Sequence, residues 1–469
     1  MHWLKEQKQQ FKQLIQELKT IKTSRQLFDF FTEERLSKLA VFFIIIWSVI
    51  PILLMFLSLF YDRSSAFSFM FNSSKLTIIW FMLMQQIGYL GMIIVVLLII
   101  KSLINRKLNN IPLKSYVLSH LVEILLFLFL LWSLFSSFFS SDLSQSFFGS
   151  DYRKDGWFSY LAYGGFFGLG YLVVRKKSIE KYLKILVGVG SVLGLLLIIN
   201  HQNLNIILTF HDRSTVFYNP NHMGYYLVIV ILSAAYLAIR KSRINLGKVI
   251  YYMLYTLLVV SLIINGSFGP YIAVSFGLLF LMIMTLYMNK SMLIHSISIS
   301  VLFIIITLIM NFETNFLSLE TAHLSEGVTD IIENNDEAGA AGSGRWSLWT
   351  NGIEFIMDEP IVGYGIENLE QAYLEEGILQ DRPHNELIQI GASIGIPALI
   401  FYGFSMFFHF FDFLKQKKKN SSLIIGLFMI VFGYFVSSMF GNSMFYTTPF
   451  FMIIFGISRG LFQLHSDEM

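Results

Sequence analysis

Residues 76–100 read LTIIWFMLMQQIGYLGMIIVVLLII, a run that contains no charged side chain. A helix needs about 20 consecutive apolar residues to cross the hydrocarbon core of a bilayer, so this run is long enough to span a membrane. Similar runs recur along the chain, near residues 40–60, 116–139, 157–174, 182–199, 223–239, 249–264, 268–288, 291–310, 386–412, 422–440 and 445–463. The sequence therefore predicts an all-α polytopic membrane protein with about 12 transmembrane helices.

The composition supports this fold class. Only 14% of the 469 residues are charged, 16% are aromatic, and the mean hydropathy is +0.61. A soluble domain would carry about 25% charged residues. The chain has no cysteine, which excludes disulfides and metal sites built on thiolates.

The distribution of charge predicts the orientation. Most of the 34 Lys and Arg residues lie in short connections such as KSLINRKLNNIPLK at 101–114 and RKKSIEKYLK at 175–184. Cytoplasmic loops carry the excess of Lys and Arg. We therefore expect both termini in the cytoplasm and residues 311–385 on the outer face, within a membrane domain that covers residues 40–463. Residues 1–39 are expected to form a cytoplasmic amphipathic segment that lies on the inner leaflet, or else a frayed charged tail.

The segment 311–385 is far longer than an ordinary connection, and long loops are usually functional or disordered. We expect a flexible acidic stretch at TDIIENNDEAGAAGSG, residues 329–344. An amphipathic helix should follow up to Pro360, then a turn at residues 363–365 and a second short helix before Pro383. The expected apolar face of the first helix consists of Trp346, Trp349, Ile353 and Ile356, which suits a membrane interface.

Four outer arginines lie in motif-like surroundings at the boundaries of spans or loops: Arg153, Arg213, Arg345 and Arg382. A guanidinium group presents a planar fork of donors that matches phosphate oxygens. Several of them together would bind a lipid-linked phosphate or diphosphate. The alternative is that each arginine pairs with a neighbouring acid, such as Asp151, Asp155, Asp212 or Asp381.

His384 follows Pro383 at the expected start of a helix, because proline is favoured in the first helical turn. The positive end of a helix disfavours imidazolium, so we expect a neutral His384 that can accept a proton beside an anion site. The alternative is a histidine that merely caps the helix.

Within the spans, ionisable residues appear almost absent. His120 and Glu123 share a helix face, and we expect them to pair with each other or with Lys114. The glycine clusters GGFFGLG and GVGSVLG should let helices pack closely, and they do not suit a nucleotide-binding loop. Neither the other outer histidines nor the acidic run at 330–337 has the spacing of a metal site.

In this order, these motifs make the chain resemble the O-antigen ligase and O-antigen polymerase family of bacterial membrane glycan transferases. Arg153 is followed by Asp-Gly, Arg213 by Asn-Pro-Asn at 219–221, and Arg345 lies in Ser-Gly-Arg before Gly-x-Gly at 363–365. The last motif is His384-Asn385, with Gly395 ten positions after Asn385.

The resemblance implies transfer of a glycan from a polyprenyl diphosphate to an acceptor hydroxyl at the outer face of the bacterial cytoplasmic membrane. The acceptor would be a glycan, a lipid or a wall polymer. It also implies that no metal, nucleotide or other cofactor is needed. Under this hypothesis His384 is the general base. The residues that would bind the diphosphate or substrate are Arg213, Arg345, Arg153, Arg382, Asn219 and Asn385.

Two choices stay open at this stage. Polymerase and ligase differ in the acceptor, which the sequence does not identify. A twelve-span exporter or flippase of polysaccharide or lipid would explain the spans, but it would not explain the long outer loop or the outer arginines. No feature indicates nucleic-acid binding.

Overall fold

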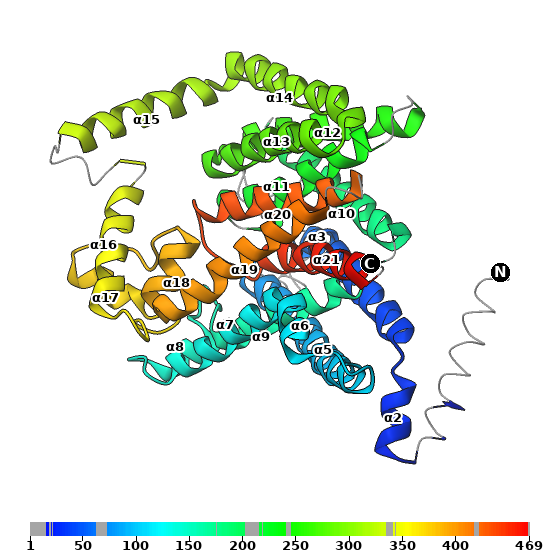
Figure 1. Cartoon of the computed structure of the whole chain (residues 1–469). Helices are drawn as coiled ribbons and strands as arrows, with labels where there is room; N and C mark the ends of the chain where they lie inside the picture. Colours follow the sequence, from blue (N-terminus) through cyan, green and yellow to red (C-terminus); the bar gives the residue numbers. More distant parts are fainter. Residues whose placement is uncertain are drawn as a thin grey trace.

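The computed structural model describes residues 16–17, 20, 22–61, 73–174, 176–201, 215–217, 219–240, 245–333, 341–342, 344–416 and 422–467. The described residues form helices and connecting turns, without any strand (Figure 1). This confirms the expected all-α class.

The longer helices form the body of the molecule. They are α3 (Glu33–Tyr61), α5 (Ser73–Leu108), α7 (Leu121–Ser137), α9 (Trp157–Tyr171), α10 (Lys176–His201), α11 (Pro220–Ile239), α12 (Leu246–Asn265), α13 (Phe268–Met288), α14 (Leu293–Thr314), α19 (Ile396–Lys415), α20 (Ser422–Ser438) and α21 (Thr448–Asp467). The connecting helices and turns are α2 (Ser24–Phe30), α6 (Leu113–Ser119), α8 (Leu143–Phe148), η1 (Thr215–Phe217), η2 (Lys290–Met292), α15 (Phe316–Glu333), α16 (Arg345–Asp358), α17 (Leu369–Glu375) and α18 (Glu386–Ile394).

Every predicted span falls on helical residues, two of them on a pair of helices, but fewer helices meet the requirements for crossing a membrane. Among the described residues, eight helices are long and apolar enough: α3, α5, α10, α11, α12, α13, α14 and α19. The pair α6 and α7, bent by 80°, makes a ninth if it is one span. Helices α9, α20 and α21 fall outside that set; α9 has 15 residues and α20 has 17. The chain is thus a multi-pass membrane protein, and the count of twelve stays a prediction.

Helix α11 is the centre of the body. All its side chains from His222 to Ile239 are buried. A helix that is apolar on every side must be covered on every side, and α10, α12, α13 and α20 pack around α11. Its N-terminus is therefore held firmly at one end of the bundle.

The glycine clusters act in packing, as expected. Gly165 of α9 lies against the backbone of Gly88 in α5, and a Cβ atom at Gly165 would overlap the Gly88 carbonyl oxygen. On α10, a Cβ at Gly190 would lie 2.5 Å from Val230 of α11. Small residues at these crossings let the helix backbones approach closely.

The predicted span at 386–412 is broken, contrary to expectation. Helix α18 ends at Ile394, Gly395 has a φ of +91°, and α19 begins at Ile396. A Cβ at Gly395 would overlap the Ile361 carbonyl oxygen, so the break requires glycine for both its conformation and its space. Only α19 is long and apolar enough to span, which leaves α18 free to contribute to the outer site.

Among its described residues, the segment 311–385 contains the end of α14 and three whole helices, α15, α16 and α17. The second short helix before Pro383 is confirmed as α17. The expectation of a flexible stretch at 329–344 is wrong for residues 329–333, which complete α15; residues 334–340 lie outside the described part. Helices α16, α17 and α18 lie together at the left of Figure 1.

The expected apolar face of α16 is also partly wrong. The buried side chains are Leu348 and Phe355, together with Gly352, whereas Trp346 and Ile353 are exposed. This face packs on α18, since a Cβ at Gly352 would lie 2.6 Å from Ile388. The side of α16 that contains Gly352 faces α18, because the close approach of α18 requires a small residue there. Residues 1–15, 18, 19 and 21 of the predicted N-terminal amphipathic segment lie outside the described part.

The expected pairing of Glu123 is wrong, because a buried arginine of the last helix takes that place. Arg459 is 1% exposed and its Nε donates to Glu123 at 2.7 Å, while its Nη1 donates to Asp412 at 2.5 Å. His120 lies at the α6–α7 bend, where its Nδ1 is 3.0 Å from the Tyr116 carbonyl oxygen. The sequence analysis overlooked Arg459 within the last apolar run.

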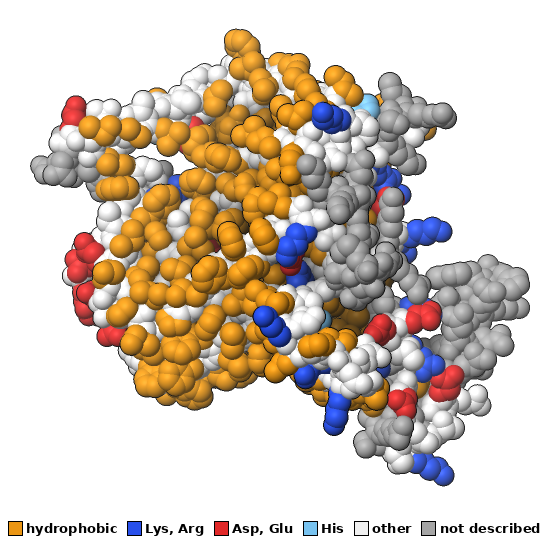
Figure 2. Space-filling view, viewed as in Figure 1, with side chains coloured by type: hydrophobic (Ala, Val, Ile, Leu, Met, Phe, Trp, Pro, Cys, Tyr) orange, Lys and Arg blue, Asp and Glu red, His pale blue; other side chains and the backbone are white. Residues whose placement is uncertain are grey.

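Charge is distributed unevenly over the surface. Figure 2 shows a cluster of acidic side chains at the left of the view, where Figure 1 has α16 and α17, and most of the visible Lys and Arg over the right half. Exposed acids of that region include Asp358, Glu359, Glu375 and Glu376. A broad apolar surface lies between, as a membrane-facing belt requires.

Candidate functional site

The segment before α18 differs from its prediction in where the helix begins. Helix α18 begins at Glu386, and its N-cap is Asn385, whose Oδ1 accepts from the backbone N–H groups of Leu387 at 3.1 Å and Ile388 at 3.2 Å. His384 precedes the cap and has a φ of +53°. The expectation that the helix starts at Pro383 or His384 is therefore wrong, and the capping alternative for His384 is wrong with it. Asn385 is preferred at this position because its short side chain reaches the free N–H groups.

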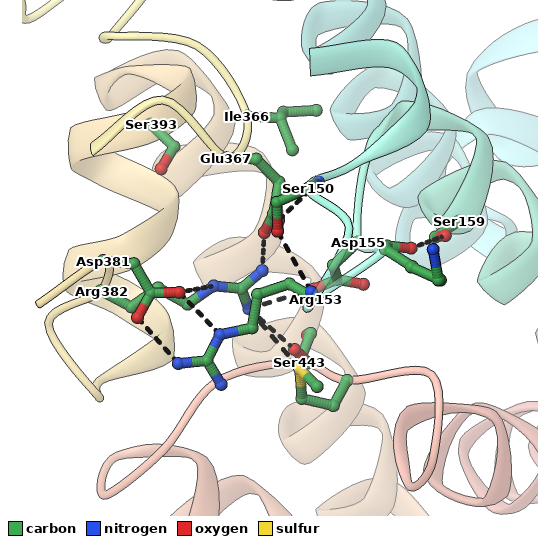
Figure 3. Close-up of polar contacts among 12 residues, drawn as sticks. Ser150, Arg153, Asp155, Ser159, Ile366, Glu367, Asp381, Arg382, Ser393 and Ser443 are labelled. Carbon is green, nitrogen blue, oxygen red and sulfur yellow. Dashed lines mark hydrogen bonds and ion pairs between the residues drawn. The ribbon is translucent and has the colours of Figure 1, made fainter. Parts of the chain in front are cut away.

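Arg153 lies in the loop between α8 and α9 and forms a two-pronged ion pair. Its Nε donates to Asp381 Oδ2 at 2.6 Å and its Nη2 donates to Asp381 Oδ1 at 2.7 Å (Figure 3). The pair joins residues 228 positions apart in the chain. It fixes the loop before α9 to the segment before α18.

Arg382 is 3% exposed and belongs to the same cluster, but its main partners are other carboxylates than the one that pairs with Arg153 (Figure 3). Its Nη2 forms an ion pair with Glu367 Oε1, and its Nη1 donates to Asp155 Oδ2 at 3.3 Å and to the Ser443 carbonyl oxygen at 3.1 Å. Ser150 Oγ donates to the other oxygen of Glu367 at 2.8 Å. Four separate segments thus meet at this one guanidinium group.

The charges of this cluster leave little room for another anion. Two guanidinium groups, of Arg153 and Arg382, face three carboxylates, of Asp155, Glu367 and Asp381. Burial raises the pKa of Asp155, and the charge of Arg382 opposes that rise. The pairing alternative that the sequence left open is therefore present for both arginines.

Strained backbone gathers at the same place. Six described residues other than glycine have a positive φ, and three of them are Lys154, Glu367 and His384. Each is next to, or part of, the Arg153–Arg382 cluster. Such conformations cost of order 1–3 kcal/mol each and persist only where the surroundings hold them, as the ion pairs do here.

Arg345 differs from the other two described arginines. It is half-buried at the start of α16, and its Nη1 donates to the Gly342 carbonyl oxygen at 3.2 Å. Its Nε is buried with no hydrogen-bond partner, and no carboxylate pairs with it among the described residues. A buried donor without a partner is costly, so this group is poised to accept an anionic ligand.

Arg345 and His384 belong to one electrostatic site. Burial is the largest cause that lowers the pKa of His384 to about 4; the charges of Arg153 and Arg345 act in the same direction, and Asp381 opposes them. Helix α16 also packs beside the His384 segment, since a Cβ at Gly352 would lie 3.4 Å from Pro383 Cβ. His384 is therefore neutral at pH 7 and can accept a proton.

The start of α11 lies beside this site. The charges of Arg153 and Arg382 act on His222, and the ring centre of His222 lies 5.4 Å from that of Tyr446, with the two ring planes tilted by 30°. Asn219 is the N-cap of α11, with its Oδ1 accepting from the Asn221 N–H at 2.8 Å. Arg213, the remaining predicted ligand, lies outside the described residues.

Ser443, which accepts a hydrogen bond from Arg382 of the cluster, also forms a hydrogen-bonded pair with Glu386. The Ser443 N–H and Oγ both donate to the Glu386 carboxylate, each at 2.5 Å. Both residues line one end of a cavity of about 1010 Å³ that continues between α5, α7, α9 and α21. The cluster is therefore supported by this hydrogen-bonded pair on one side and borders the cavity.

The sequence analysis missed Glu367 and Ser443 as members of the site. Glu367 lies two positions after Gly365 of the Gly-x-Gly turn, so an acid close behind that turn was the available signal. Ser443 lies in the connection between α20 and α21, and nothing in its surroundings distinguishes it. Among the described residues, no group of three or more His, Cys, Asp or Glu side chains could hold a metal ion.

The comparison with known families adds independent evidence. Residues 253–403 match the family model described as O-antigen ligase. The matched segment contains Arg345, Glu367, Asp381, Arg382 and His384, and it ends within α19. A search of curated proteins finds no match to the chain. The similarity to the O-antigen ligase family therefore covers residues 253–403, which is less than half of the chain.

Proposed function

We propose that the protein transfers a glycan from a polyprenyl diphosphate to the hydroxyl group of an acceptor. The reaction would occur on the outer face of the bacterial cytoplasmic membrane, with both termini in the cytoplasm. The observation that carries the proposal is that Arg345, whose buried Nε has no hydrogen-bond partner among the described residues, acts with its charge on a neutral His384.

Arg345 and Arg213 would bind the diphosphate of the donor. As the bond between the sugar and the phosphate breaks, the diphosphate gains negative charge. A fixed guanidinium group stabilises that developing charge more than it stabilises the bound donor, which is how it accelerates the reaction. This role requires an arginine without a carboxylate partner, as Arg345 is among the described residues.

His384 would accept the proton of the acceptor hydroxyl. The oxygen then attacks the anomeric carbon of the sugar, a glycosidic bond forms, and the diphosphate leaves with the bonding electron pair. General-base catalysis of this kind contributes roughly 10²–10⁴ in rate. A base must be unprotonated at the working pH, and the low pKa of His384 provides this.

Arg153 and Arg382 would act as helpers that position the site. Direct contact with the diphosphate would require their ion pairs with Asp381 and Glu367 to open. In their paired state they would hold the His384 segment in place, and their charges add to burial, the larger cause, in lowering the pKa of His384. Asn219 and Asn385 would support the substrate through the helix ends that they cap.

The test is a transfer assay with purified protein, a polyprenyl-diphosphate-linked oligosaccharide and an acceptor, in the presence of a chelator. Arg345→Ala should abolish transfer, and Arg345→Lys should recover only part of it, because lysine lacks the two-pronged fork. Glu354→Gln on the exposed side of α16 is the matched control and should keep full activity. Full activity of Arg345→Ala would refute the diphosphate role.

The same assay separates this function from export, because an exporter moves a glycan without making a new glycosidic bond. A deletion strain would then separate polymerase from ligase. Loss of a polymerase shortens the lipid-linked glycan, whereas loss of a ligase leaves full-length chains on the lipid carrier.

A further inference from the structure

The far end of the internal cavity is chemically unlike its outer end. Beside the outer site the cavity is lined by Glu386, Ser443 and hydroxyl groups, whereas its opposite end is lined by Lys101, Ser102 and Arg106 near the end of α5. Between the two ends the walls are apolar, with contributions from α5, α7 and α9. A space with a basic end and apolar walls suits an amphipathic anion.

The two basic groups are available to such a ligand. Arg106 Nε donates to the Ile111 carbonyl oxygen at 3.2 Å, and its guanidinium carbon lies 5.9 Å from the ring centre of Tyr116. Lys101 Nζ lies 4.8 Å from the ring centre of Phe28. Neither group has a carboxylate partner within 4.0 Å among the described residues.

The nearby acids do not cancel this charge. Glu123 lines the same part of the cavity, but Arg459 pairs with it, and Asp412, which shares Arg459, also pairs with Lys415 at 2.9 Å. Glu33 lies in the first turn of α3, where the helix N-terminus stabilises a carboxylate. When the negative charge of Glu33 is subtracted from the positive charges of Lys101 and Arg106, this end of the cavity still has a net positive charge.

The bend at His120 shapes this end of the space. Helices α6 and α7 meet at 80°, and α6 contributes Ser115 and Tyr116 to the lining. Tyr116 OH donates to Ser102 Oγ at 2.9 Å, which joins α6 to α5. The hydroxyl groups of this end are thus held beside the two cations.

We propose that this basic end, defined by Lys101, Ser102, Arg106 and Tyr116, is a binding site for an anionic phospholipid of the inner leaflet. The headgroup phosphate would bind Lys101 and Arg106, and an acyl chain would occupy the apolar part of the cavity. The positive-inside bias of the sequence places this end on the cytoplasmic side. Basic pockets between membrane helices on that side are suited to anionic headgroups.

The test compares lipid binding to the purified full-length protein by native mass spectrometry, with phosphatidylglycerol and phosphatidylcholine as probes. The wild type should retain phosphatidylglycerol in preference to phosphatidylcholine. Each cation near an anionic headgroup contributes enough to predict a roughly 30-fold weaker affinity for phosphatidylglycerol in Lys101→Gln/Arg106→Gln. Phosphatidylcholine binding should not change.

Lys107→Gln is the matched control, because Lys107 is exposed on the same helix and does not line the cavity. It should bind like the wild type, and Lys101→Arg/Arg106→Lys should restore affinity, which separates a charge effect from misfolding. Equal loss in the control, or equal binding of both lipids by the wild type, would overturn the proposal.

Two further probes test which part of the lipid is recognised. Glycerol phosphate, which lacks acyl chains, should not compete with phosphatidylglycerol; effective competition would mean a site for free phosphate and would overturn the lipid assignment. Diacylglycerol, which lacks the phosphate, should bind weakly; binding as tight as that of phosphatidylglycerol would show that the cations have no role.

Discussion

The proposed base makes a quantitative prediction about pH. If turnover requires neutral His384, the acidic limb of the rate profile should report its pKa of about 4 instead of the ordinary value of about 6.5. At pH 5.5 the neutral fraction would then be roughly 97%, against roughly 9% for an unperturbed histidine. The rate at pH 5.5 should therefore nearly equal the rate at pH 7.5, whereas an ordinary histidine would give about a tenfold drop.

A substitution at Arg153 should shift the pKa of His384, and the charges around the imidazole ring give the direction of this shift. Arg153 exerts the largest charge effect that lowers the pKa of His384. Arg153→Gln should therefore raise this pKa and move the acidic limb to higher pH. Burial, which is the larger cause of the low pKa, should remain.

The substitution His384→Gln separates the loss of proton transfer from a loss of hydrogen bonding at this position. Glutamine keeps hydrogen bonding but accepts no proton, so turnover should fall by roughly 10²–10⁴, which corresponds to about 2.7–5.4 kcal/mol in the activation free energy. Donor binding should be nearly unchanged, because the arginines hold the diphosphate. Initial rates between pH 4 and pH 8 and a donor-binding isotherm are the measurements. Near-normal turnover in His384→Gln, or an unchanged acidic limb in Arg153→Gln, would refute the reasoning.

Three further predictions concern stability and topology. Arg382→Ala should cost about 3–5 kcal/mol, because it leaves buried carboxylates unpaired, and should lower the thermal unfolding temperature, whereas Arg345→Ala should not. Asn385→Ala should cost about 1 kcal/mol through loss of the α18 cap while leaving the acidic limb in place, as thermal unfolding and rate profiles would show. Single cysteines in the cysteine-free chain should react with an impermeant reagent from outside at Glu375 and not at Lys107; the reverse pattern would contradict the orientation.

The positions of the helices could be predicted from the sequence because lipid demands long apolar runs with satisfied backbone groups. The break at Gly395 could not, because it depends on the approach of the Ile361 backbone, which belongs to a distant segment. Periodicity likewise misplaced the buried face of α16, since the neighbour that selects the face is α18.

The candidate site, too, could be predicted only in part from the sequence. The order of the motifs predicted four of the site residues, because arginine and histidine are unusual in segments that are otherwise acidic. These residues are Arg153, Arg345, Arg382 and His384. Their division into paired and available arginines depends on contacts such as Arg382–Asp155, between residues 227 positions apart. No local pattern encodes such a contact.

The ion pair of Arg459 has a consequence for how the protein is made. Glu123 and Arg459 are separated by 336 residues, so at about 5–20 residues per second the ribosome needs roughly 17–70 s to deliver the arginine after the carboxylate. During that interval the newly inserted α7 carries a carboxylate whose permanent partner does not yet exist. Assembly of α7 and α19 can become final only when α21 enters the membrane, so the insertion of α21 is the step that commits these helices to their native arrangement.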